Sequence, residues 1–180
     1  LRRHHHVKAS LMESRTKRAK GVGASRGMIL AALVAVFAVI TDQLTKAWAL
    51  SALVEGRRIG VIGEHLSLVL TRNSGAAFSL GASSTWIFTI LALVIIGVLV
   101  YALVRARSTR LAASIGLLLG GAIGNLIDRL IQPPSFGQGH VIDFIDYAGF
   151  FVGNVADIWI VLGAAWLAIE MILGEKTKHE

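Results

Sequence analysis

The chain has 180 residues, of which 54% are hydrophobic and only 16% charged; it carries a formal net charge of +7 and contains no cysteine. The lack of cysteine excludes a disulfide scaffold, a thiolate metal site and a cysteine nucleophile. Because the charged fraction is low for a soluble domain and the apolar residues stand in long blocks, the composition favours a membrane protein.

Residues 1–27 form the first segment. They are rich in lysine and arginine and show no apolar periodicity. Segments that carry charge without enough apolar surface to bury do not fold alone. We therefore predict a disordered basic tail on the cytoplasmic side of the membrane.

Four apolar blocks follow the tail. Each is long enough to cross a bilayer, which takes about 20 residues of helix. The third block is rich in glycine, which allows helices to approach closely. We expect an all-α membrane domain, residues 28–173, in which four transmembrane helices form a bundle; the blocks cover residues 27–50, 84–104, 111–131 and 153–173.

The positive charges predict how these helices are oriented. Basic residues gather in the N-terminal tail, in the segment 105–110 between the second and third blocks, and near the end of the chain at Lys176 and Lys178. Four spans place these three segments on one side, and loops rich in lysine and arginine stay in the cytoplasm. Both termini, including the C-terminal tail 174–180, are expected there. Topology thus accounts for the net charge, and no nucleic-acid partner is expected.

Two segments are left for the outer side. In residues 51–83, the stretch "LSLVLT" at 66–71 alternates apolar and polar residues, a strand pattern, and Gly and Asn residues follow it. We expect a small β-rich segment resting on the outer membrane surface. Residues 132–152 contain turn residues and aromatics suited to the interface, and we predict a loop.

Polar residues converge near the outer ends of the predicted helices. Pairs at helical spacing of three or four positions lie in the first, third and fourth blocks, and two more polar residues lie in the outer segments. The orientation brings all of them to one level of the membrane. They are Asp42, Lys46, Asn73, Asn125, Asp128, Arg129, Asp143, Asn154 and Asp157. Ionisable groups inside a membrane are costly and point to function.

The four carboxylates among them differ in their neighbours. Asp42 stands four positions before Lys46 and could be a structural ion-pair partner, and Asp128 stands beside Arg129, which would keep it ionised. Asp143 and Asp157 have no basic residue within four positions except His140. Two such carboxyls close together share a proton, which is the chemistry of aspartic proteases.

Other interpretations remain open at this point. Lys46 could serve as the base of a Ser–Lys peptidase with Ser51 or Ser74, although Asp42 would keep it charged. Intramembrane Asp and Arg also mark ion paths, so a small transporter or proton channel is the alternative from another class. A metal site is a less favoured interpretation, because His65 and His140 lie in different segments. The asparagines could be plain helix caps or interhelical hydrogen-bonding groups.

Five motifs occur in order across residues 28–173: "TDQLTK", "RNSGAAF", "GGAIGNLIDR", "HVIDF" and "GNVADI". Together they resemble the lipoprotein signal peptidase (signal peptidase II) family. The resemblance implies a bacterial membrane aspartyl endopeptidase with a four-helix bundle and a small extracytoplasmic β-cradle. It implies that the catalytic pair is Asp143 and Asp157. The supporting and substrate-binding positions would be Asp42, Lys46, Asn73, Gly124, Asn125, Asp128, Arg129 and Asn154.

The resemblance also implies the substrate, the other ligands and the location of the protein in the cell. The family removes the signal peptide from prolipoproteins, cutting before a cysteine that carries diacylglycerol, and uses no metal or cofactor. Membrane lipid and globomycin-type peptide inhibitors are the other expected ligands. The enzyme would lie in the bacterial cytoplasmic (inner) membrane with its active site at the outer face. The chain departs from the family at Gly153, where Phe is frequent, and in the lengths of the two outer loops around Asp143, which affect the shape of the substrate lid.

Overall fold

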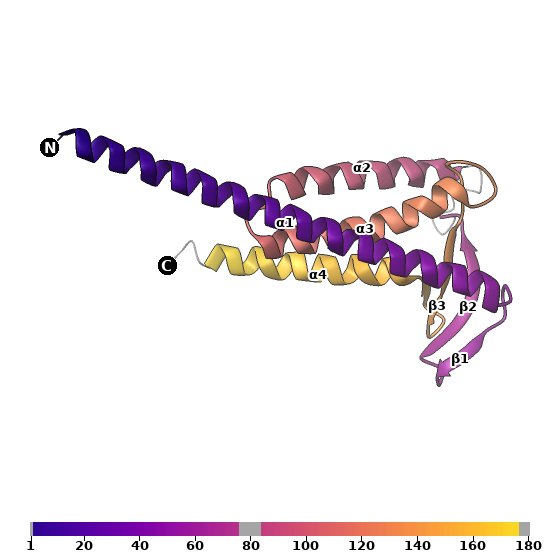
Figure 1. Cartoon of the computed structure of the whole chain (residues 1–180). Coiled ribbons are helices and arrows are strands. Elements are labelled where there is room, and N and C mark those ends of the chain that lie inside the picture. The colour runs from indigo at the N-terminus through magenta and orange to yellow at the C-terminus, as the bar shows by residue number, and fades with distance from the viewer. Residues whose placement is uncertain (1, 76–83, 177–180) are drawn as a thin grey trace.

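The computed structural model describes residues 2–75 and 84–176, with side chains for residues 26–75 and 84–174. Helices make up most of it, and the sheet is small (Figure 1). Within the described residues, four helices are long and apolar enough to cross a membrane, as the sequence predicted. They are α1 (Arg2–Ala52), α2 (Thr85–Val104), α3 (Thr109–Ile131) and α4 (Val155–Lys176).

Helix α3 is the centre of the bundle. In its apolar window 72% of the residues are buried, against 22% in α1, 6% in α2 and 11% in α4. Glycines permit this packing: a Cβ at Gly116 would lie 2.5 Å from the carbonyl oxygen of Ala31 in α1, and one at Gly121 would lie 2.6 Å from that of Ala156 in α4. Helices in lipid associate through such close contacts rather than through apolar burial.

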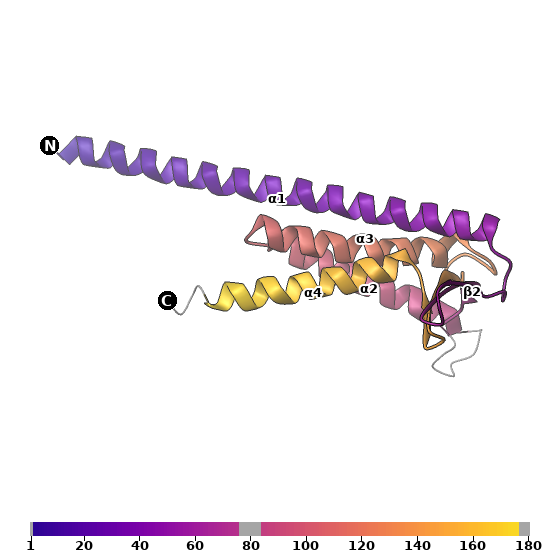
Figure 2. The ribbon, with the colours of Figure 1, turned by 90° about the horizontal axis from the view of Figure 1, so that it is seen from below.

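A four-stranded antiparallel sheet caps one end of the bundle, called here the sheet end. Its order is β1 (Ile59–Ile62), β2 (Leu66–Asn73), β3 (Val141–Tyr147) and β4 (Phe151–Gly153). Helix α1 begins and α4 ends at the opposite end of the molecule (Figures 1 and 2). The end of α1 thus meets the sheet where α4 starts.

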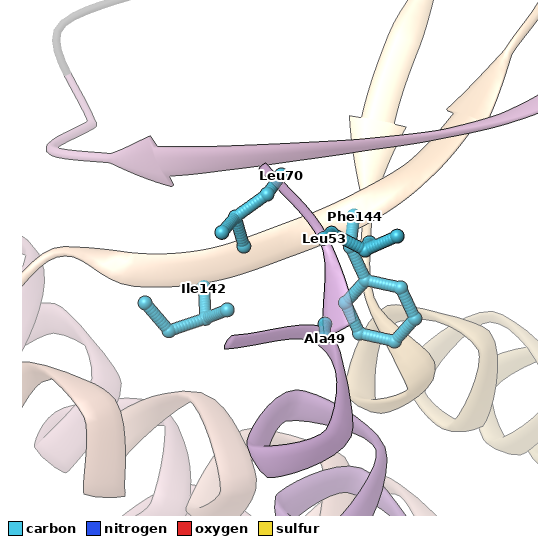
Figure 3. Packing of buried hydrophobic residues seen from close by; sticks show 5 residues of the cluster. All are labelled: Ala49, Leu53, Leu70, Ile142 and Phe144. Carbon is cyan, nitrogen blue, oxygen red and sulfur yellow. The ribbon is translucent and has the colours of Figure 1, made fainter. Parts of the chain in front are cut away.

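A small apolar core joins the sheet to α1. Ala49 near the end of α1 and Leu53 just beyond it pack with one residue of β2 and two of β3, namely Leu70, Ile142 and Phe144 (Figure 3). All five are buried. This core fixes β3 above the helices, and β3 carries one of the candidate catalytic residues.

Two expectations from the sequence are corrected by the structure. Residues 132–152, predicted as a loop, contain β3 and the start of β4. The strand "VIDFIDY" is buried on both faces and therefore lacks the alternation that marks a half-exposed strand. Residues 2–27, predicted as disordered, continue α1. The segment holds many good helix formers and no proline, and extending an existing helix avoids the cost of nucleation.

Candidate active site

A buried ammonium group lies at the base of the site. Lys46 Nζ is 2.8 Å from Asp42 Oδ2 and 2.8 Å from Asp128 Oδ2, and it donates a hydrogen bond of 3.0 Å to Asn125 Oδ1. The lysine and both aspartates are buried. Buried charges of this kind are tolerated when they are paired and their remaining polar atoms are satisfied. We call Lys46, Asp42 and Asp128 the lysine cluster.

Helical spacing builds this cluster. Asp42 and Lys46 are four positions apart on α1, so they share one face of the helix. Gly124 of α3 leaves room for them, because a Cβ there would lie 2.5 Å from Asp42 Oδ2. Asp42 Oδ1 also accepts a hydrogen bond of 2.9 Å from the backbone N–H of Ala156. That N–H belongs to the first turn of α4, where a negative charge is favourable.

Asn125 connects the lysine cluster to Asp157. Its Oδ1 accepts hydrogen bonds from Lys46 and from Asn154 Nδ2, both at 3.0 Å. Its Nδ2 donates to Asp157 Oδ1 at 3.0 Å. The lysine therefore fixes which way the amide faces, since an ammonium group can only donate. The amide nitrogen is left to hold the carboxyl of Asp157.

Asn154 has two functions at once. Its Oδ1 accepts a hydrogen bond of 3.0 Å from the backbone N–H of Asp157, while its own N–H donates to Asp157 Oδ2 at 3.1 Å. This reciprocal pair resembles a capping box at the start of α4. Its Nδ2 donates to Asp143 Oδ1 at 2.7 Å. The cap that was one interpretation of Asn154 is present, and the same side chain contacts both members of the candidate catalytic pair.

Asp143 lies on β3, and only 2% of it is exposed. Asn73, near the end of β2, donates from Nδ2 to Asp143 Oδ2 at 3.0 Å. Burial raises the pKa of Asp143 to about 7; the hydrogen bond from Asn73 opposes the rise, and the charge of Asp157 adds to it. A carboxyl group with this pKa exchanges protons near neutral pH. Asp143 and Asp157, the aspartate pair, are held by amides rather than by a cation.

The direct ion pair of Asp128 is with Lys46 rather than with the neighbouring Arg129. Neighbouring residues on a helix point to different faces, and Asp128 instead holds Lys46 and accepts a hydrogen bond of 3.0 Å from the backbone N–H of Ile142. The guanidinium of Arg129 lies 5.3 Å from the ring centre of Phe88 and donates weakly, at 3.5 Å, to the carbonyl of Gly139. Arg129 therefore lines the α2 side of the site.

The sequence analysis did not identify Gln43, which contacts the lysine cluster, or an apolar pocket next to Asp157. Gln43 donates to Asp42 Oδ2 at 3.1 Å, to Asp128 Oδ1 at 3.2 Å and to the carbonyl of Gly124 at 3.1 Å. A glutamine within an apolar span is itself a signal. An apolar pocket of about 340 Å³ lies beside Asp157, and Tyr147 and Phe151 are among the residues that line it.

The contacts in the structure do not support a Ser–Lys peptidase, a metal site or an ion path. Ser51 donates to the carbonyl of Trp48 at 2.8 Å, and the recorded contacts of Lys46 are two carboxylates and one amide. Among the residues that the structure describes, no group of three His, Asp or Glu side chains is arranged to hold a metal ion. Most buried polar residues gather at the sheet end, whereas an ion path needs them at several depths.

A family model described as signal peptidase (SPase) II matches residues 34–173. The chain belongs to the signal peptidase II family. The match covers all five motifs and both members of the aspartate pair, and it confirms the resemblance seen in the sequence. Signal peptidase II is a peptidase family, so the site described above is the candidate active site of a membrane protease.

Relatives and solved structures agree with this assignment. A lipoprotein signal peptidase of Bifidobacterium longum (strain DJO10A) is 44% identical over 149 residues, covering 83% of this chain and 81% of the relative. One of Rhodococcus jostii (strain RHA1) is 42% identical, covering 81% of this chain and 74% of the relative. A bacterial membrane enzyme solved by the in meso method has a TM-score of 0.69 at 32% identity, covering 78% of this chain and 91% of that chain.

Proposed function

We propose that this protein is an aspartic endopeptidase that removes the signal peptide from prolipoproteins, cutting before the cysteine that carries diacylglycerol. The observation that carries the proposal is the aspartate pair: two carboxyls that Asn154 contacts together, one of them with a pKa of about 7. The names of the relatives support the substrate class. A metal or cofactor is not needed for this chemistry.

The two carboxyls divide the proton transfer between them. Asp157 accepts hydrogen bonds from Asn125 and from the backbone of Asn154, and donors of this kind stabilise a carboxylate. It acts as the base that takes a proton from the attacking water. Asp143, whose pKa of about 7 lets it carry a proton near neutral pH, donates that proton to the carbonyl oxygen of the scissile bond. The water oxygen bonds to the carbonyl carbon. When the C–N bond breaks, Asp157 gives the proton it took to the leaving nitrogen, and the carbonyl re-forms as its O–H returns a proton to Asp143.

We also propose the placement in the membrane. The basic segments favour both termini in the cytoplasm, which puts the sheet end, with its aspartate pair, at the outer face of the bacterial cytoplasmic membrane. Residues 28–173 are then the peptidase domain, the sheet is the extracytoplasmic β-cradle, and 174–180 are a cytoplasmic tail. Reporter fusions test this: a fusion after residue 178 reads cytoplasmic, and one near Gly60 reads external. The opposite pattern rules out the placement.

The proposed partners follow from the same site. The substrate is a diacylglyceryl-modified prolipoprotein that reaches the aspartate pair from the surrounding lipid. Globomycin-type peptides are expected to inhibit by occupying the space next to Asp143 and Asp157. Asn73, which contacts Asp143 and is itself exposed, is placed to hold a substrate backbone, while the buried Asn154 supports the aspartate pair from behind. No nucleic acid takes part.

The decisive experiment is cleavage in vitro by purified enzyme. The substrates are one prolipoprotein prepared with and without its diacylglyceryl group, and the product is identified by mass spectrometry. We expect cleavage of the modified form only, with the lipidated cysteine as the new N-terminus. Cleavage at another bond, or by an enzyme with Asp143→Asn and Asp157→Asn together, rules out the proposed reaction.

A further inference from the structure

Exposed arginines gather at the end of the bundle opposite the sheet, where α2 turns into α3 (Figures 1 and 2). Gly27 brings α1 to this turn, because a Cβ there would lie only 3.7 Å from the Cα of Thr109. Three of the arginines lie at the turn and one precedes Gly27 on α1. We call them together the arginine cluster: Arg105, Arg107, Arg110 and Arg26.

Little negative charge compensates the arginine cluster. Among the residues whose side chains the structure describes, the ion pair recorded here joins Arg110 Nε to Glu170 Oε1 of α4 at 3.9 Å. This distance is close to the limit for an ion pair, and the side chain of Arg110 is 76% exposed. The same oxygen of Glu170 also accepts a hydrogen bond of 3.2 Å from the indole N–H of Trp166. The cluster therefore stays strongly positive and attracts anions.

Arg105 is held in an orientation that suits a phosphate. Its guanidinium carbon lies 4.6 Å from the centre of the Tyr101 ring, one helical turn earlier in α2. A guanidinium that lies over an aromatic ring keeps the N–H groups at its edge available, and their fork matches two oxygens of a phosphate. Tyr101 is itself 61% exposed, so this fork is presented at the surface of the bundle.

The surface next to the arginine cluster favours a lipid over a soluble anion. Val104, the last residue of its candidate span, directly precedes Arg105 and is 68% exposed. On α1, Ile29 follows Arg26 by one turn and is 60% exposed. A soluble anion or an acidic protein would contact the arginines alone. A phospholipid would place its phosphate on the guanidinium groups and its acyl chains along the exposed apolar residues, and hydrocarbon gains from such contact.

We propose that the arginine cluster binds the phosphate of an anionic phospholipid. Under the proposed membrane placement this lipid belongs to the cytoplasmic leaflet, whose surface is negative. Because the cluster includes residues of α1 and of the α2–α3 turn, a bound phosphate holds these two segments together and stabilises this end of the bundle. The inference goes beyond the peptidase function and does not depend on it, since binding at this end involves neither the aspartate pair nor turnover.

The test measures lipid binding by the purified full-length protein. Protein in detergent is titrated with short-chain phosphatidylglycerol or phosphatidylcholine, and bound lipid is counted by native mass spectrometry. We expect the wild type to prefer phosphatidylglycerol. In the double variant Arg105→Gln with Arg107→Gln, the Kd for this lipid should rise about 25-fold at low salt, because each basic residue near an anionic headgroup strengthens binding roughly fivefold. The variant keeps Arg26, Arg110 and the basic N-terminal segment, which still orient it in the membrane.

Two controls separate the arginine cluster from net charge. Arg57→Gln with Arg72→Gln removes two exposed charges at the sheet end and should leave the Kd for phosphatidylglycerol at the wild-type value. Arg105→Lys with Arg107→Lys keeps the charge but lacks the guanidinium fork, so its Kd should lie between those of the wild type and the glutamine variant. Phosphatidylglycerol should also raise the thermal midpoint of the wild type more than that of the glutamine variant.

Other outcomes overturn the inference. Equal affinity of the wild type for the two lipids means that no anionic headgroup is recognised, and an equal rise in Kd for the sheet-end variant means that only net charge matters. Inorganic phosphate is added as a competitor: if it displaces the lipid at the same concentration as short-chain phosphatidylglycerol does, the site takes a soluble anion. A phosphatidylglycerol with a photoreactive headgroup gives a measurement that needs no variant, because on the wild type it must label the segment 101–110. Labelling confined to other segments rules out the arginine cluster as the site, whether or not the protein cleaves prolipoprotein.

Discussion

Two pairs of carboxyls lie at the sheet end, and their partners differ; all but the partly exposed Asp157 are buried. In the lysine cluster, Asp42 and Asp128 share the ammonium group of Lys46. In the aspartate pair, the side-chain amide of Asn154 donates to Asp143 and that of Asn125 donates to Asp157. A cation compensates buried negative charge directly, whereas the amides on Asp143 oppose the effect of burial only in part, and its pKa still rises to about 7. The first arrangement suits structure and the second suits catalysis.

The largest expected effect on activity comes from the aspartate pair itself. Asn at either position keeps the shape of the side chain but cannot exchange a proton, so Asp143→Asn and Asp157→Asn should each lower kcat/KM at least about a hundredfold. The double variant should lower kcat/KM little further than either single variant, because the effects of residues in one catalytic unit are not additive. Turnover is measured on lipidated substrate, together with the thermal midpoint of each purified variant. A folded Asp157→Asn enzyme with near-normal activity contradicts the aspartyl mechanism.

Removal of the shared cation should act mainly on stability. Lys46→Met leaves Asp42 and Asp128 buried without compensation, and breaking a buried pair in this way costs about 3–5 kcal/mol. We expect a large fall in the yield of folded protein and in the thermal midpoint. The matched control is Arg57→Met, which removes an exposed cation near the sheet and should change little. If Lys46→Met melts like the control, the lysine does not hold the cluster together.

The sequence predicts the spans, the sheet around β2 and the convergence of the polar residues, because helical spacing and charge asymmetry are local signals. It does not predict the partners of Asp128, since whether Lys46 or Arg129 reaches it depends on how α1 packs on α3. The amide orientation of Asn125 likewise follows from a lysine 79 positions away. The pocket beside Asp157 needs the β3–β4 hairpin, whose first strand is buried on both faces and shows no alternation.

The pH dependence of activity and of stability should follow the titration of Asp143. Its pKa of about 7 predicts that kcat/KM falls as the pH rises through neutrality, because the proton that it donates is lost. Stability should change in the same direction. The pKa of Asp143 in the folded protein lies above the ordinary aspartate value of 3.8, so the protonated group contributes stability that is complete below pH 3.8 and is lost as the pH rises through about 7.

Thermal melts across this range, with Asp143→Asn as the control, separate this contribution from others. The asparagine variant cannot titrate at this position, so its thermal midpoint should fall less than that of the wild type between the two pKa values. The charges that act on this group, Lys46 in α1, Arg129 in α3 and Asp157 in α4, are present in both proteins. Identical pH dependence of the two midpoints would show that Asp143 does not titrate near neutrality.

The smallest effect is expected far from both groups, at the start of α1. The structure continues this helix through residues 2–25, beyond the other helices (Figure 1), whereas close packing on α3 involves Gly27 and Ala31. Deletion of residues 2–25 keeps Arg26 and the basic segment 105–110, which suffice to orient the bundle. Cleavage should therefore stay within a few-fold of the full-length enzyme. A longer deletion, through residue 33, is the control: it removes Ala31, against whose backbone Gly116 packs, and should abolish folded protein. A folded but inactive enzyme after the shorter deletion would show that the basic segment takes part in the reaction.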